Sequence, residues 1–133
     1  MSININSPMY YTTLFGVNEE IYNMCLHITK SIDIKEYTSK LDVIGITPII
    51  APQEELKDGK WAEEKKVCLP YRYASISLTI KYEQYVHLDI ANQKKLIVKN
   101  MFDSLQVVKR KIGKDFDFAK LQNDILNSIS AFL

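Results

Sequence analysis

The apolar residues change their spacing between residues 74 and 113, and this change limits the folds open to the chain. Every second residue from 76 to 82 is apolar, which is the period of a half-buried strand. From residue 89 to 113 the apolar positions follow the helical period instead, and they include Ile97, Met101, Leu105, Val108 and Ile112. A half-buried strand followed by an amphipathic helix predicts helices packed on one face of a sheet.

The remaining segments add further elements to this unit. The patterns predict strands over 10–15, 41–50 and 67–73 and helices over 18–32 and 117–132. Asn18, Asp89 or Asn92, and Asp115 or Asp117 are suited to cap the three helices, and Gly113 to end the second. Pro48 should end regular strand pairing, since it lacks an N–H group. The polar residues 53–66, with a turn at Asp58-Gly59, predict an exposed loop or hairpin.

The order of these elements, βαβββαα, predicts the fold class. Strands grouped in the middle and helices towards both ends favour an α+β fold, with a small, mainly antiparallel sheet covered by helices, over alternating βαβ units. The 133 residues fit a single domain over 1–133, and 47% hydrophobic and 25% charged residues are typical of a globular protein.

The location of the protein is predicted from its cysteines and its apolar segments. Cys25 and Cys68 are the two cysteines, and the opening residues 1–6 contain neither Lys nor Arg nor an apolar leader, so we expect a cytoplasmic protein with reduced thiols. Polar residues interrupt every apolar stretch before it reaches the length of a membrane span. We therefore expect no membrane insertion.

The net charge of +1 conceals two halves of opposite sign. Residues 1–64 contain ten acids and five bases, and residues 65–133 contain six acids and twelve bases. The bases are densest from Lys94 to Lys114, where seven of them accompany the single acid Asp103. This segment is either a nucleic-acid footprint or a solvated helix face with cations near its C-terminus. The near-neutral pI of about 7.7 favours the second interpretation.

The residues that could carry catalysis or hold a metal do not form a convincing motif. The four glycines are dispersed, which excludes a glycine-rich phosphate loop. Cys68, His87 and Asp89 are the one candidate for thiol catalysis, yet nothing near Cys68 suggests an activated thiolate. Cys25 and His27 lie two positions apart on a helix, so they cannot easily share a zinc ion with Cys68 and His87. We expect no catalytic residues, no bound metal and no cofactor.

The polar segment 53–66 has the composition of a protein-binding surface. Acidic residues surround the single tryptophan, and two tyrosines follow on the next strand, which gives the candidate set Glu54, Glu55, Asp58, Trp61, Glu63, Glu64, Tyr71 and Tyr73. Aromatic residues are enriched at interface centres, and charges steer association. The alternative is that Trp61 folds inward and the acids only keep the loop solvated. The adjacent pairs Glu54-Glu55 and Glu63-Glu64 could also serve acid-base chemistry, but such pairs are more often plain surface charge.

Three stretches between Ile46 and Lys111 resemble the immunity proteins of bacterial polymorphic-toxin and contact-dependent growth-inhibition systems. They are the apolar strand 46–50, the alternating strand 75–82 running into Tyr85, and residues 95–98 leading to Ser104-Leu105. An acidic residue commonly follows the position of Ile80 in such relatives, whereas this chain has Lys81. No role of that acid can therefore be transferred.

The resemblance implies a cytoplasmic inhibitor that binds one cognate toxin domain, often a nuclease, and performs no catalysis itself. Its partner would be a protein, and neither a membrane nor a small-molecule ligand is expected. The alternative from another class is a nucleic-acid-associated protein that uses the basic helix from Lys94 to Lys114.

Overall fold

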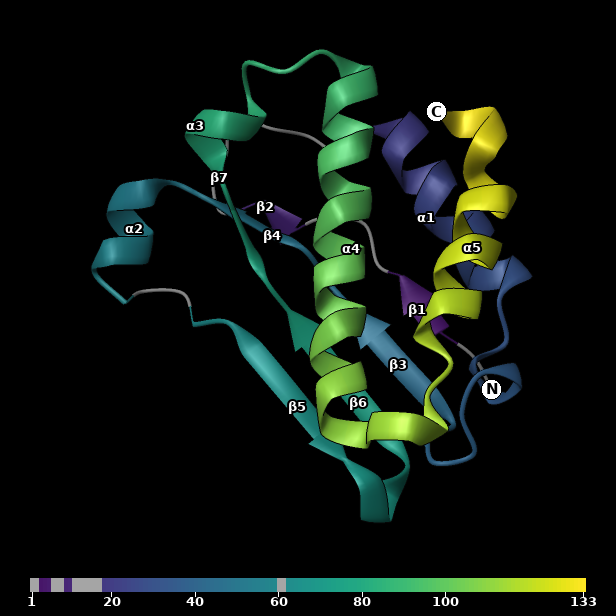
Figure 1. Cartoon of the computed structure of the whole chain (residues 1–133). Coiled ribbons are helices and arrows are strands. Elements are labelled where there is room, and N and C mark those ends of the chain that lie inside the picture. The colour runs from purple at the N-terminus through teal and green to yellow at the C-terminus, as the bar shows by residue number, and fades with distance from the viewer. Residues whose placement is uncertain (1–2, 6–8, 11–17, 60–61) are drawn as a thin grey trace.

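The computed structural model describes residues 3–5, 9–10, 18–59 and 62–133. Figure 1 shows the arrangement of the helices and strands. The elements are β1 (Ile3–Ile5), β2 (Met9–Tyr10), α1 (Glu19–Ser31), β3 (Val43–Ile46), β4 (Ile49–Ala51), α2 (Gln53–Lys57), β5 (Glu64–Cys68), β6 (Tyr73–Ser77), β7 (Thr79–Lys81), α3 (Tyr82–Tyr85), α4 (Ile90–Ile112) and α5 (Phe118–Ile129). Four short 3-10 turns join them: η1 (Ile34–Glu36), η2 (Leu69–Tyr71), η3 (Gly113–Asp115) and η4 (Ser130–Phe132). The predicted α+β class is confirmed, and the element order roughly matches the predicted one.

The direction of the strands differs from the prediction. The strands form sheets in the orders β1-β3-β6-β5 and β2-β4-β7, and every pairing is parallel except that of β5 with β6. The expectation of a mainly antiparallel sheet was therefore wrong. The connections explain this result. α1 lies between β1 and β3 in the chain and lets β3 run parallel to β1, as in a βαβ unit. α2 and β5 lie between β4 and β6 and let β6 run parallel to β3.

The two sheets follow one another along the chain: β3 of the first sheet leads into β4 of the second, and β6 leads into β7. Pro48 separates β3 from β4, and Leu78 separates β6 from β7. The two segments of the chain stay side by side across this break. The Thr47 N–H donates to the Ile76 carbonyl at 3.0 Å, and the Ile49 N–H donates to the Leu78 carbonyl at 3.0 Å. The predicted interruption at Pro48 is confirmed, whereas the break at Leu78 has no sequence signal.

The helices begin and end where the capping residues predict. The side chain of Asn18 accepts from the N–H groups of Glu20 and Ile21, and those of Asp89 and Asp117 cap α4 and α5. Gly113 follows α4 with a φ of 81°, a conformation that glycine adopts without strain. These side chains satisfy backbone donors that would otherwise have no partner in the helix.

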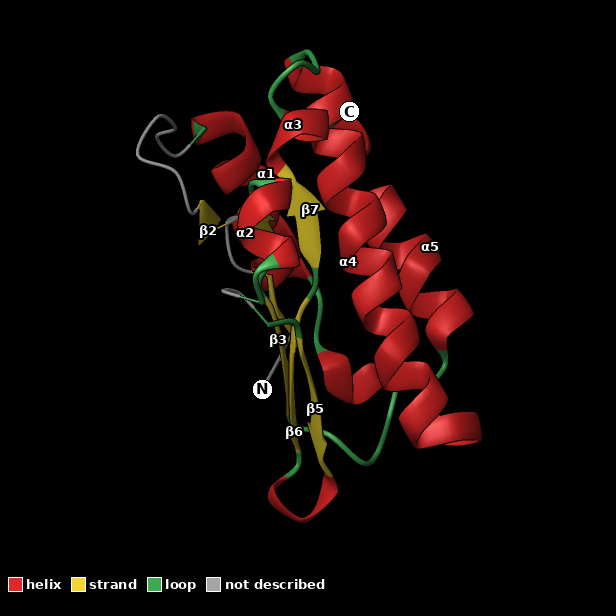
Figure 2. Ribbon diagram, turned by 90° about the vertical axis from the view of Figure 1, so that its left-hand side faces the viewer, coloured by secondary structure: helices red, strands yellow, loops and turns green. Residues whose placement is uncertain are grey.

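In the lower part of the sheet, the helices of the described residues lie on one face. Figure 2 shows α4 and α5 on one side of β5 and β6, and no described helix on the other side of these two strands. Alternate residues of β6 follow this division, because Ala74 and Ile76 are buried while Tyr73, Ser75 and Ser77 are half-buried. The buried residues join the apolar faces of α1, α4 and α5 in the core.

Three predicted segments differ in detail. Tyr10 lies in β2, and the rest of the predicted strand 10–15 falls outside the described residues. The segment 53–66 contains α2 and the start of β5 instead of only a loop, and Pro70 lies in η2, so the strand expected over 67–73 covers 64–68. The short β1 was not predicted. None of the helices in the described part of the chain combines the length and apolar character that a membrane span requires.

Candidate partner-binding surface

The cysteines and histidines do not come together. Cys68 ends β5 at one end of the molecule, whereas His87 follows α3 at the opposite end (Figure 1). Cys25 is buried in α1, and burial raises the pKa of its thiol to about 12. His27 is exposed beside Phe132. Among the described residues, no group of His, Cys, Asp and Glu side chains could hold a metal ion.

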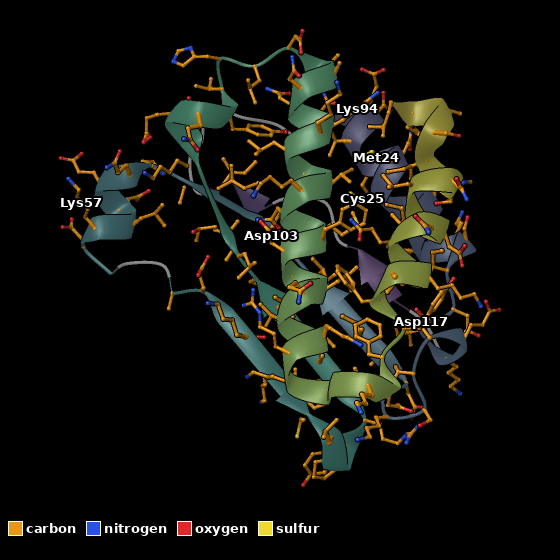
Figure 3. The ribbon with its side chains drawn as sticks, in the orientation of Figure 1. Met24, Cys25, Lys57, Lys94, Asp103 and Asp117 are labelled. Atoms are coloured by element: carbon orange, nitrogen blue, oxygen red, sulfur yellow. The ribbon has the colours of Figure 1, made fainter. Side chains whose placement is uncertain are left out.

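The first acidic residues of the candidate set are carried by α2 and by the residue that follows it, Asp58. Glu54 and Asp58 are exposed, Glu55 is half-buried, and Figure 3 shows Lys57 projecting from the same helix. A residue of another helix anchors the first residue of α2, because the Gln53 N–H donates to the Glu83 carboxylate of α3 at 2.6 Å. The result is an acidic projection at one end of the molecule.

The two following acids have different environments. The Glu63 carboxylate accepts from the Thr79 N–H at 2.8 Å and from its hydroxyl at 3.2 Å, so it closes the outer edge of β7. Glu64 is exposed on β5. Glu63 is therefore partly a structural residue, while Glu64 is open to a partner. The predicted role of Trp61 falls outside the described residues.

The two tyrosines of the candidate set lie at the other end of β5. Tyr73 pairs in register with Cys68, and the Lys66 ammonium lies 5.5 Å from the centroid of the Tyr73 ring. Tyr71 lies in η2, with 78% of its surface exposed. The length of β5 separates these tyrosines from α2 (Figure 1). The structure thus divides the candidate set into an acidic end and an aromatic end.

Sequence reasoning missed three residues of the aromatic end. Leu69 and Pro70 are exposed next to Tyr71, and Arg72 follows with a φ of 58°. A proline between two large apolar residues signals a turn, and this would have identified the exposed turn at residues 69–71. Nothing in the sequence indicates the conformation of Arg72, which depends on partners 30 and 33 positions away, Asp42 and Ser39.

A polar network supports the turn at residues 69–71 through the residue that follows it, Arg72. The Arg72 guanidinium donates to the Ser39 carbonyl at 2.8 Å and lies 3.1 Å from the Asp42 carboxylate, while the Asp42 N–H donates to the Arg72 carbonyl at 2.8 Å. Asp115, in η3, accepts from the Thr38 hydroxyl at 2.7 Å and from the Ser39 N–H at 2.9 Å. These contacts fix the segment 38–42 against Arg72, at the turn between β5 and β6.

The same contacts hold two carboxyl groups in their charged form. The hydrogen bond from Arg72 lowers the pKa of Asp42. Hydrogen bonds from the Thr38 hydroxyl and then from Ser39 lower the pKa of Asp115. Because both pKa values are depressed in the folded state, the network is weakened by protonation at acid pH.

The basic segment from Lys94 to Lys114 is largely occupied within the fold. Lys94 is buried and donates to the Phe132 carbonyl at 2.9 Å. Lys109 donates to the carbonyls of Gly113 and Phe116, Lys111 donates to that of Lys65, and Lys99 pairs with Asp103. The exposed bases that remain are Lys95, Arg110 and Lys114. This arrangement does not favour the nucleic-acid alternative, which needs clustered free cations.

Comparison with known proteins gives a family match. The family model described as Immunity protein 44 matches residues 1–131, well beyond the segment from Ile46 to Lys111 that carried the resemblance in the sequence. No curated protein and no solved structure matches the chain.

Proposed function

This chain belongs to the immunity protein 44 family, and from that premise we propose that it binds one cognate toxin domain in the bacterial cytoplasm and neutralises it by covering its active site or substrate surface. The match over residues 1–131 is the observation that carries this proposal, because it spans nearly the whole chain. Inhibition by binding requires no catalytic group on the inhibitor. The partner is a protein, delivered by a polymorphic-toxin or contact-dependent growth-inhibition system.

The charge of the acidic end supports a nuclease as the target. Glu54, Asp58 and Glu64 are exposed, and domains that act on RNA or DNA present basic surfaces to phosphate. Complementary charges speed the encounter of two proteins and make its rate sensitive to salt. The proposed binding surface comprises the acidic end at α2 and Glu64 and the aromatic end at Tyr71 and Tyr73, and we propose Trp61 as a further contact residue.

Co-expression with the toxin domain encoded beside this chain tests the proposal. The expected result is cell survival and co-purification of the two proteins, with neither when the immunity chain is omitted. Cys68→Ala and His87→Ala should protect as well as the parent, because the proposed mechanism uses no nucleophile. Failure to bind or protect would refute the proposal. Loss of protection by either variant, with unchanged folding and toxin binding, would refute the non-catalytic mechanism.

A further inference from the structure

The end of the hairpin formed by β5 and β6 presents consecutive apolar residues to solvent. Leu69 has 39% and Tyr71 has 78% of its surface exposed, and Pro70 between them is exposed as well. Burial of apolar side chains of this size lowers the free energy, and side chains that stay in water do not gain this contribution. Contiguous exposed apolar residues commonly mark interaction sites. We call residues 69–71 the tip.

The residue that follows the tip has an unfavourable backbone conformation. Arg72 has a φ of 58° and a ψ of 39°, and it is the one non-glycine residue with a positive φ in the described ranges. An L-amino acid with a long side chain rarely adopts this left-handed region. Such a conformation persists where the surrounding structure enforces it, and it is often associated with function.

The surrounding structure enforces it through the polar network. The Arg72 N–H donates to the Leu69 carbonyl at 3.0 Å and closes the turn. Its guanidinium contacts Ser39 and Asp42, and Asp115 in turn fixes Ser39. The tip is thus held in one conformation before any partner binds, which reduces the entropy lost on binding.

Resting on the proposed function, we infer that the tip is the anchor of the complex: Leu69, Pro70 and Tyr71 insert into an apolar recess of the cognate toxin domain. Arg72 is the positioning residue that holds them in place. A projecting apolar tip fits a concave apolar surface, and buried aromatic residues dominate the energetics of interfaces. A second copy of this chain is a poorer occupant, because two convex tips cannot bury the roughly 1,200 Å² or more of a stable interface.

The anchor and the acidic end then have separable kinetic roles. The carboxylates of α2 act on the rate of association, in a salt-dependent way. The tip acts mainly on the rate of dissociation, because apolar contacts form after the encounter and are little affected by salt.

Binding kinetics with the isolated, catalytically inactivated toxin domain test the inference. Tyr71→Ser and Leu69→Ser should each raise the dissociation rate about tenfold or more, with association and its salt dependence nearly unchanged. Tyr22→Ser is the matched control, because Tyr22 is a tyrosine with 45% of its surface exposed on α1, away from the tip (Figure 1). Its binding should equal that of the parent.

Arg72→Gly tests the positioning role. Glycine accepts the left-handed backbone but lacks the guanidinium and its contacts with the Ser39 carbonyl and the Asp42 carboxylate, so the tip should sample other conformations. The apparent affinity should fall in proportion to the population of the competent conformation. A purely structural role would lower the melting temperature and leave toxin binding at 25 °C unchanged.

The outcomes separate the inference from the proposed function. If the parent neither binds nor protects, both are overturned. If the parent binds and Tyr71→Ser and Leu69→Ser dissociate as the parent does, the tip inference alone is overturned. A dimer of the chain that sediments as a monomer after Tyr71→Ser would also overturn it, because the tip would then bind a second copy.

Discussion

The lysines of α4 and the carboxylates of α2 and its C-cap are both groups of mostly like charge in the sequence, but they have different roles in the structure. Lys94, Lys109 and Lys111 donate to backbone carbonyls of other segments. Glu54 and Asp58 point into solvent on a helix that projects from the sheet. A run of charge therefore does not indicate a binding surface until the partners of its members are known.

The difference follows from where each helix lies. α4 packs on the sheet, and a lysine has a long aliphatic chain that can lie along apolar surface while its ammonium reaches a polar atom. The carbonyls at the ends of α4, α5 and β5 provide such atoms. α2 has five residues and none of them is buried, so Glu54 and the C-cap residue Asp58 are exposed to solvent. Four experiments test how these charged groups contribute to folding and to binding.

Removal of the internal cations should have the largest effect on stability. Lys94→Met and Lys109→Met should each lower the free energy of unfolding by about 1–3 kcal/mol, because each leaves buried or half-buried carbonyls without a charged donor. Lys95→Met on the same helix is the control and should change it by less than about 0.5 kcal/mol. Chemical denaturation measures all three. Equal free energies of unfolding for the three variants would show that Lys94 and Lys109 stabilise the fold no more than the exposed Lys95.

Acid should weaken the network behind the tip. The folded-state pKa of Asp115 lies below its unfolded value, so its contribution is complete above the unfolded pKa, near 4, and is lost as the pH falls through the folded one. Asp115→Asn should therefore be less stable than the parent at pH 7, and the difference should shrink towards pH 2. Thermal unfolding across this range measures it. A difference that is constant with pH would show that ionisation of Asp115 is not involved.

Charge reversal on α2 should change binding far more than folding. Glu54→Lys combined with Asp58→Lys should shift the free energy of unfolding by no more than about 0.5 kcal/mol and slow association with the toxin domain severalfold at low salt. The difference should fade as salt is raised, because screening shortens the range of the charges. An association rate equal to that of the parent at low salt would exclude α2 from the encounter.

The smallest effect that we expect is binding of the protein to nucleic acid. The exposed bases Lys95, Arg110 and Lys114 should give at most the non-specific affinity of about 10⁻⁴–10⁻⁶ M for short RNA or DNA at physiological salt, with a steep decrease as salt rises. A fluorescence anisotropy titration at two salt concentrations measures this. A dissociation constant far below that range would restore the basic helix as a functional surface.

The local elements could be predicted from sequence because their causes are local. Asn18, Asp89 and Gly113 define helix ends through neighbouring backbone groups, and Pro48 ends a strand because it has no N–H. Alternation around Ile76 correctly placed a half-buried strand. These signals act within a few residues and need no knowledge of the fold.

The non-local features could not be predicted in the same way. Parallel pairing depends on where α1 and α2 return the chain, and periodicity says nothing about strand direction. β1 has three residues, too few for a pattern. The separation of Tyr71 from Glu54 follows from the direction of β5, and the brace on Arg72 depends on Ser39 and Asp42 from another segment. The candidate set therefore combined two surfaces that the fold keeps apart.

The two cysteines give the molecule one chemically addressable position. Alkylating reagents react with thiolates, and a buried Cys25 with a pKa of about 12 offers almost none at neutral pH. Cys68 is half-buried and directly precedes Leu69. A maleimide dye added to the native protein should therefore attach at Cys68 and leave Cys25 unmodified. The natural chain thus accepts a fluorophore beside the hairpin end without any engineered residue.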